Sequence, residues 1–147
     1  MTRPHKQDER HRAREAALQI LYHWDIARGD VADTAETFFA LQWPDAGPPP
    51  ASIRTFASEL ARDTVERLPV IDPLVAETAA RWRPERMAML DRLILRMAVC
   101  EFVREPRPPA AVVIDEALEL ARTFSTEESV GFINGMLDAI RKKLELI

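Results

Sequence analysis

Residues 112–140 read VVIDEALELARTFSTEESVGFINGMLDAI, and this stretch decides the fold class. Apolar side chains recur at intervals of three and four residues on both sides of Ser125, which predicts two amphipathic helices joined by a tight corner. Ser125 followed by Glu128 predicts a capping box at this corner. In that arrangement the serine oxygen accepts a hydrogen bond from a free backbone N–H of the second helix, and the glutamate returns to the serine N–H.

Two glycines, Gly131 and Gly135, interrupt the second predicted helix. Each costs a helix about 1 kcal/mol relative to alanine, so both positions need a reason. One explanation is close backbone packing against a neighbouring helix. The other is an open surface at which a ligand or a partner approaches the backbone.

The composition is that of one helical domain. The chain has 147 residues, of which 47% are hydrophobic, and only four glycines. This balance favours helices over sheet and allows a substantial core. The sole cysteine, Cys100, lies in an apolar run, which predicts a buried structural thiol rather than a nucleophile and suits a reducing cytoplasm. No apolar run approaches the roughly 20 residues that span a bilayer, and no signal-type segment follows the N-terminus. We expect a soluble cytoplasmic protein.

The chain before the corner predicts further helices and no strand. Gly29 is the predicted end of the first helix, and Asp30 is the predicted N-cap of the second. Residues 43–50, WPDAGPPP, predict a loop. A third helix is expected over residues 52–68, where Pro69 stops it because proline has no N–H to donate.

The second half begins at a proline-marked break. Asp72 and Pro73 predict the N-cap and first position of a fourth helix. Residues 87–103 are apolar nearly all round, which predicts a helix in the middle of the core. The sequence thus predicts an all-α fold of about seven helices, as a single domain with N-terminal (1–69) and C-terminal (70–147) halves.

A basic arm precedes the first predicted helix, although the net charge of the chain is −4. Its cations within residues 1–14 are Arg3, Lys6, Arg10, Arg12 and Arg14. Such an arm can bind nucleic acid by displacing counterions from phosphates, but a solvated, frayed terminus has the same composition. Tyr22 lies two turns beyond Arg14. Its ring can stack on an unpaired RNA base, or it can be a core aromatic with its hydroxyl at the surface.

The sequence contains no persuasive catalytic constellation. The three histidines, at positions 5, 11 and 23, have no cysteine or histidine partners at metal-ligand spacing, which argues against a zinc site. There is no Walker-type loop and no GxGxxG motif. Ser125 and Ser129 lack a nearby histidine base. We therefore expect a binding protein without a cofactor or metal rather than an enzyme.

Three segments resemble the NusB family of bacterial transcription antitermination factors. They are RHRAREAALQILYHWDI (10–26), LDRLILRMAVCEF (90–102) and IDEALELARTFSTEESVGFINGMLD (114–138). They stand in the family's order, and the resemblance extends over nearly the whole chain. The resemblance implies two small helical bundles. It also implies a factor that binds boxA RNA of rRNA leader transcripts together with the ribosomal protein NusE, as part of the RNA polymerase antitermination complex.

The resemblance also implies site residues, carried over by position. The RNA surface would comprise Arg10, Arg12, Arg14, Tyr22, Phe124, Glu128 and Phe132. Glu85 and Asp91 would pair with basic residues of NusE. Two departures are visible: His11 stands where relatives often carry arginine, and PPAAV at 108–112 replaces an aromatic-containing segment, which puts one partner contact near Ala110 in doubt.

Two other classes remain open. One is the NusB-like module that accompanies an rRNA cytosine methyltransferase, which we expect less because no nucleotide-cofactor domain follows before Ile147. The other is a purely structural homodimer that hides the RNA surface. The Glu128 carboxylate is an open point, because it repels phosphate and so either limits RNA affinity or only caps its helix.

Overall fold

The computed structural model describes residues 5–79 and 87–146, with side chains from residue 9 onward. This part of the chain forms seven α-helices and one short π-helix and contains no strand, so the all-α prediction is confirmed. The elements are α1 (His5–Ala27), α2 (Val31–Thr37), η1 (Phe38–Gln42), α3 (Ala51–Glu66), α4 (Leu68–Thr78), α5 (Met89–Val103), α6 (Ala110–Phe124) and α7 (Glu127–Lys143). They divide into two compact units, Met1–Val65 and Glu66–Ile147, a few residues before the predicted division.

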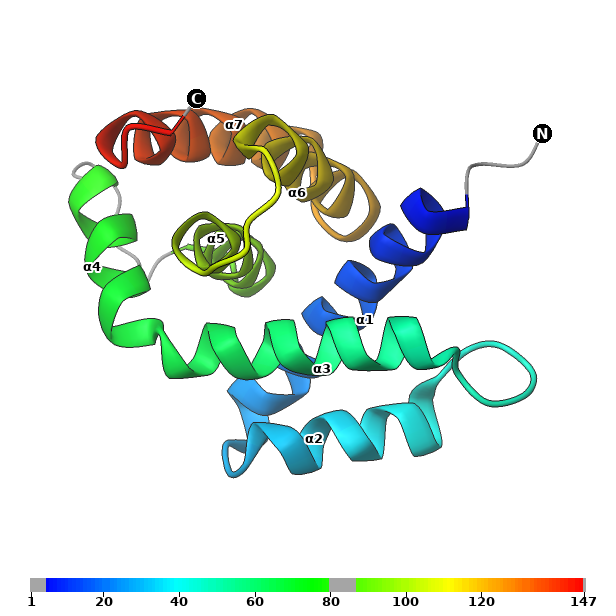
Figure 1. Cartoon of the computed structure of the whole chain (residues 1–147). Coiled ribbons are helices and arrows are strands. Elements are labelled where there is room, and N and C mark those ends of the chain that lie inside the picture. The colour runs from blue at the N-terminus through cyan, green and yellow to red at the C-terminus, as the bar shows by residue number, and fades with distance from the viewer. Residues whose placement is uncertain (1–4, 80–86, 147) are drawn as a thin grey trace. The chain divides into compact units, whose positions relative to one another are not determined.

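The first unit contains α1, α2, η1 and α3. The α2–η1 segment and α3 lie side by side and antiparallel, joined by the loop of residues 43–50 (Figure 1), so this loop prediction is confirmed. Every one of these elements contributes buried apolar side chains, among them Trp24, Val31, Phe38, Phe39 and Leu60.

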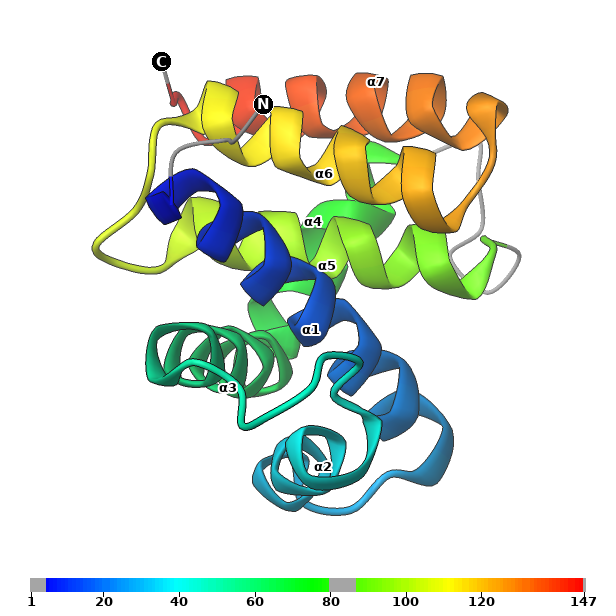
Figure 2. The same ribbon diagram turned by 90° about the vertical axis from the view of Figure 1, so that its right-hand side faces the viewer.

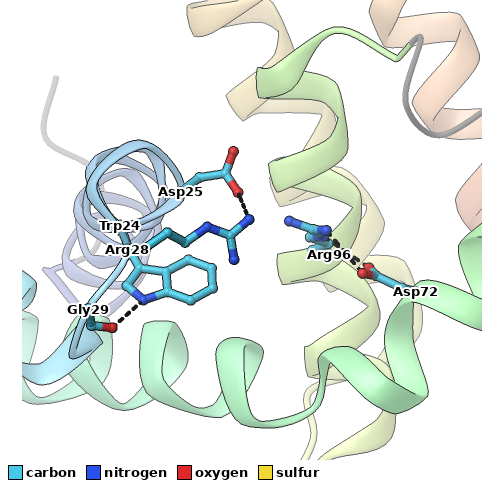
Figure 3. Close-up of polar contacts among 6 residues, drawn as sticks. All are labelled: Trp24, Asp25, Arg28, Gly29, Asp72 and Arg96. Atoms are coloured by element: carbon cyan, nitrogen blue, oxygen red, sulfur yellow. Dashed lines mark hydrogen bonds and ion pairs between the residues drawn. The ribbon is translucent and has the colours of Figure 1, made fainter.

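The end of α1 is a left-handed turn. Arg28 and Gly29 adopt φ angles of 59° and 95°, and Gly29 does so without the steric cost of a Cβ. The Trp24 indole N–H donates to the Gly29 carbonyl at 2.9 Å, and the Arg28 guanidinium lies 4.7 Å from the Trp24 ring centroid (Figure 3). Asp30 then accepts a 3.0 Å hydrogen bond from the backbone N–H two residues later. The predicted helix end and N-cap are therefore confirmed.

The second unit is built around α5. Helices α5, α6 and α7 run antiparallel in succession (Figure 2), and α4 packs against α5 and α7. Ten of the fifteen residues of α5 are buried, which confirms the predicted central helix. Cys100 lies within α5 with no exposed surface, as expected for a structural thiol. In the described ranges, no helix has the length and apolarity to cross a bilayer.

The predicted start of the fourth helix is wrong. α4 begins at Leu68, so Pro69 lies in its first turn and Pro73 in its interior. A proline in the first turn costs little because its missing N–H would have no helical partner there. Asp72 does not cap the helix. Its carboxylate instead receives two hydrogen bonds from Arg96 of α5, Nε to Oδ1 at 2.9 Å and Nη2 to Oδ2 at 3.0 Å (Figure 3).

Candidate nucleic-acid interface

In the first unit, α1 places two arginines of the basic arm against one ring of α3. The guanidinium carbons of Arg10 and Arg14 lie 4.2 and 5.3 Å from the ring centroid of Phe56. The ring attracts both cations through its quadrupole and so restrains their side chains. Arg10 is exposed, whereas Arg14 is only 4% exposed. Arg10 is thus the accessible cation of this pair.

Arg12 is held by the loop of residues 43–50. Its Nη2 pairs with the Asp45 carboxylate, and its guanidinium carbon lies 4.8 Å from the ring centroid of Trp43. The Trp43 ring in turn lies against Phe39, with centroids 5.8 Å apart. The position of this cation therefore depends on the loop as well as on α1.

Tyr22 presents an aromatic ring at the surface of α1. Its side chain is 38% exposed, and its ring meets that of His23 edge to face at 5.9 Å. Ile26, one turn further, is 60% exposed. The exposure of Tyr22 shows that it reaches the surface, as both base stacking and a core aromatic with a surface hydroxyl require. Its contact with RNA stays a prediction, as it does for the three arginines.

In the second unit, the corner between α6 and α7 is capped by Thr126. Its hydroxyl accepts a 3.1 Å hydrogen bond from the Ser129 N–H. The predicted capping box of Ser125 with Glu128 is therefore wrong by one residue. The Ser125 N–H still closes α6, donating at 2.8 Å to the carbonyl four residues earlier, and its hydroxyl is directed to α5. Neither group is left to form the predicted box.

Asp91 of α5 fixes this corner. It is 7% exposed, and its Oδ1 and Oδ2 accept hydrogen bonds from the Ser125 and Ser129 hydroxyls, each at 2.7 Å. Hydrogen bonds to an ionised acceptor are stronger than neutral ones, so the pair joins α5 firmly to the corner. The resemblance implied a partner contact for Asp91. That contact stays a prediction beside this structural role, and Glu85 lies outside the described residues.

The corner presents aromatic and open backbone surface. Phe124 and Phe132 are half-buried, and Glu128 is exposed in the first turn of α7, where a carboxylate complements the helix dipole. A Cβ added at Gly131 or Gly135 would meet no described atom within 4 Å. The close-packing explanation for these glycines is therefore wrong, and both lie on an open face of α7.

Sequence reasoning did not identify the side chains that hold the arginines. Phe56 belongs to the apolar period of α3, and residues 43–50 were predicted only as a connection. Arg12 and Asp45 are 33 residues apart in the sequence, so no local sequence pattern predicts that they pair. Asp45, the only charged residue of this loop and two residues after Trp43, was the one available signal.

Comparisons with known proteins agree with this architecture. The NusB family model matches residues 11–142. The transcription antitermination protein NusB of Solibacter usitatus (strain Ellin6076) is 47% identical over 135 residues, which are 92% of this chain and 90% of that protein. Its counterpart in Koribacter versatilis (strain Ellin345) is 41% identical over 140 residues, with 95% and 93% covered.

Solved structures give the same result. A structure of T. maritima NusB matches with a TM-score of 0.80 at 30% identity, covering 97% of this chain and 94% of that one. A NusB chain crystallised with NusE and dsRNA matches in fold, with a TM-score of 0.79 at 22% identity over 92% of this chain and 98% of that one. Because the match extends along nearly the full length of these proteins, the chain belongs to the NusB family.

Proposed function

We propose that this protein is a cytoplasmic transcription antitermination factor. It binds the boxA RNA of rRNA leader transcripts together with NusE and tethers the transcript to the transcribing polymerase complex. Family membership supports this proposal, because the relatives from Solibacter usitatus and Koribacter versatilis are named transcription antitermination protein. A NusB of the same fold has been crystallised with NusE and dsRNA.

The observation that carries the proposal is the set of guanidinium groups on α1, ahead of an exposed aromatic ring. Arg10 is exposed, Arg12 is half-buried, and Tyr22 is exposed on the same helix. Arginines gain by releasing counterions from phosphates, and an aromatic ring stacks on unpaired bases. The chain as a whole is acidic, with a net charge of −4, which disfavours polyanions elsewhere and suits a basic protein partner.

The α6–α7 corner adds a second group of contacts to the proposal. The half-buried rings of Phe124 and Phe132 are suited to contact bases. The Glu128 carboxylate repels phosphate, and with Thr126 serving as the N-cap it is not needed to cap α7. We therefore assign Glu128 the role of limiting phosphate binding at this corner.

The test is fluorescence-anisotropy binding of a short single-stranded boxA RNA and a scrambled RNA, with and without NusE, at two salt concentrations. We expect a preference for boxA that increases with NusE. Arg10→Ala should weaken the binding of both RNAs. It should also flatten the salt slope, which is the slope of log affinity against log salt concentration, by about 0.7, the value for one phosphate contact on a single strand. Arg62→Ala, at a 52% exposed side chain of α3, is the matched charge control and should leave the affinity for both RNAs and its salt dependence nearly unchanged.

Equal affinity for boxA and scrambled RNA in every condition would refute the proposal. Equal losses from Arg10→Ala and Arg62→Ala would show that the salt dependence reflects overall charge and not a surface on α1.

A further inference from the structure

One arginine of the proposed RNA surface already has an anionic partner within its own unit. Arg12 Nη2 pairs with Asp45 Oδ2, and the two side chains are 29% and 49% exposed. Solvent therefore reaches the ion pair. The Trp43 ring also contacts the Arg12 guanidinium, with 4.8 Å between the guanidinium carbon and the ring centroid.

The two contacts differ in how they respond to RNA. A carboxylate and a phosphate offer a guanidinium the same kind of anionic oxygen acceptor, so Asp45 and a phosphate compete for the Arg12 N–H groups. The π face of Trp43 does not use those donors and can keep its contact while a phosphate binds. When a phosphate replaces Asp45, the released carboxylate stays close and repels the RNA.

We propose that Asp45 is a built-in competitor for RNA phosphate at Arg12, so that the loop of residues 43–50 restrains the RNA affinity of the arm. This inference rests on the proposed RNA-binding function and adds an autoinhibitory contact to it. The loop keeps Asp45 near its target, because Trp43 is anchored against Phe39 and Pro48 to Pro50 are stiff. A tethered competitor of this kind has a high effective concentration.

The competition predicts a distinct salt dependence. A free arginine releases counterions from the phosphate that it neutralises, which gives a slope of about −0.7 per contact on a single strand. In the wild-type protein, the freed Asp45 stays beside the bound phosphate and offsets the charge of Arg12, so this contribution is reduced. Asp45→Asn should therefore steepen the slope by up to about 0.7. It should also raise affinity about 1.4- to fivefold, the range for loss of an exposed ion pair.

The experiment compares the wild type with Asp45→Asn, Arg12→Gln and the double variant, using boxA and scrambled single-stranded RNA. Asp33→Asn, at an exposed side chain of α2, is the control for the change in net charge. Elution from a heparin column with salt adds a polyanion that has no base sequence. We expect Asp45→Asn to bind both RNAs more tightly and to elute later than Asp33→Asn. When Arg12 is already glutamine, we expect a smaller gain from Asp45→Asn, no larger than the gain from Asp33→Asn.

The outcomes separate this inference from the proposed function. If the wild type prefers boxA but Asp45→Asn and Asp33→Asn behave alike, the competitor is refuted and the function stands. If neither RNA is bound, the proposed function is refuted; a heparin elution shift only for Asp45→Asn and only with Arg12 present would then show that Asp45 competes with a polyanion, and not with RNA, for Arg12. An undiminished gain in the double variant would also refute the competitor.

Discussion

Replacing Asp91 by alanine should loosen the α6–α7 corner and destabilise the protein. Asp91 is 7% exposed, and its carboxylate accepts hydrogen bonds from the hydroxyls of Ser125 and Ser129, each at 2.7 Å. The alanine variant removes both interactions from a site that water barely reaches. The two serine oxygens lie 3.0 Å apart, so the hydroxyls can bond to each other and recover a part of the loss.

The magnitude follows from these contacts. A hydrogen bond to a charged group contributes about 1.5–3 kcal/mol. Two such bonds, reduced by the desolvation cost of the wild-type carboxylate and by the remaining serine contact, give an expected loss of about 2–4 kcal/mol in the free energy of unfolding. Asp91→Asn keeps the shape and one acceptor oxygen, so its loss should be smaller.

The assay is urea unfolding monitored by the circular-dichroism signal of the helices. A double-mutant cycle combines Asp91→Ala with Ser129→Ala. Asp115→Ala is the matched control, because Asp115 is an exposed carboxylate within α6 and alanine is the better helix former there. A loss below about 0.5 kcal/mol for Asp91→Ala, or additive effects of Asp91→Ala and Ser129→Ala, would refute the assigned role of this carboxylate.

Four further substitutions test local features of the second unit. Gly131→Ala and Gly135→Ala should each raise the free energy of unfolding by up to about 1 kcal/mol, since a new Cβ meets no described atom within 4 Å; a simultaneous loss of RNA or NusE binding would identify this face as a contact surface. Thr126→Ala should cost about 1 kcal/mol in urea unfolding through loss of the N-cap. Hydrogen bonds from Arg141 and a neighbouring lysine hold the pKa of Asp138 below its usual range. The stability that this carboxylate contributes is thus present at neutral pH and is lost as the pH falls through its lowered pKa, and NMR titration of Arg141→Gln should show that pKa rising.

Helix positions were predictable because they depend on periodicity within the element. The nearly continuous apolar character of residues 87–103 identified α5 as the central helix, and ten of its residues are buried. Asp30 was predictable as an N-cap because its hydrogen bond reaches only two residues along the chain. Signals of this range are present in the sequence itself.

Helix ends were mispredicted where a distant partner engages the capping side chain. The Ser125 hydroxyl donates a hydrogen bond to Asp91, 34 residues away, and Thr126 is the N-cap of α7 instead. Asp72 binds Arg96, 24 residues away, and α4 begins before it. In both cases the sequence offered a suitable capping residue, and tertiary contacts in the second unit decided its use. Such partners cannot be inferred from spacing alone.

The same reasoning limits what composition says about the candidate site. The arm was identified from its cations, but the strength of an RNA-binding surface depends on how many of those cations can turn to phosphate. Arg14 is 4% exposed, and Arg12 is paired with Asp45. Two chains with the same arm but a different residue in place of Asp45 should therefore differ in RNA affinity and in salt slope, even though their first helices are identical.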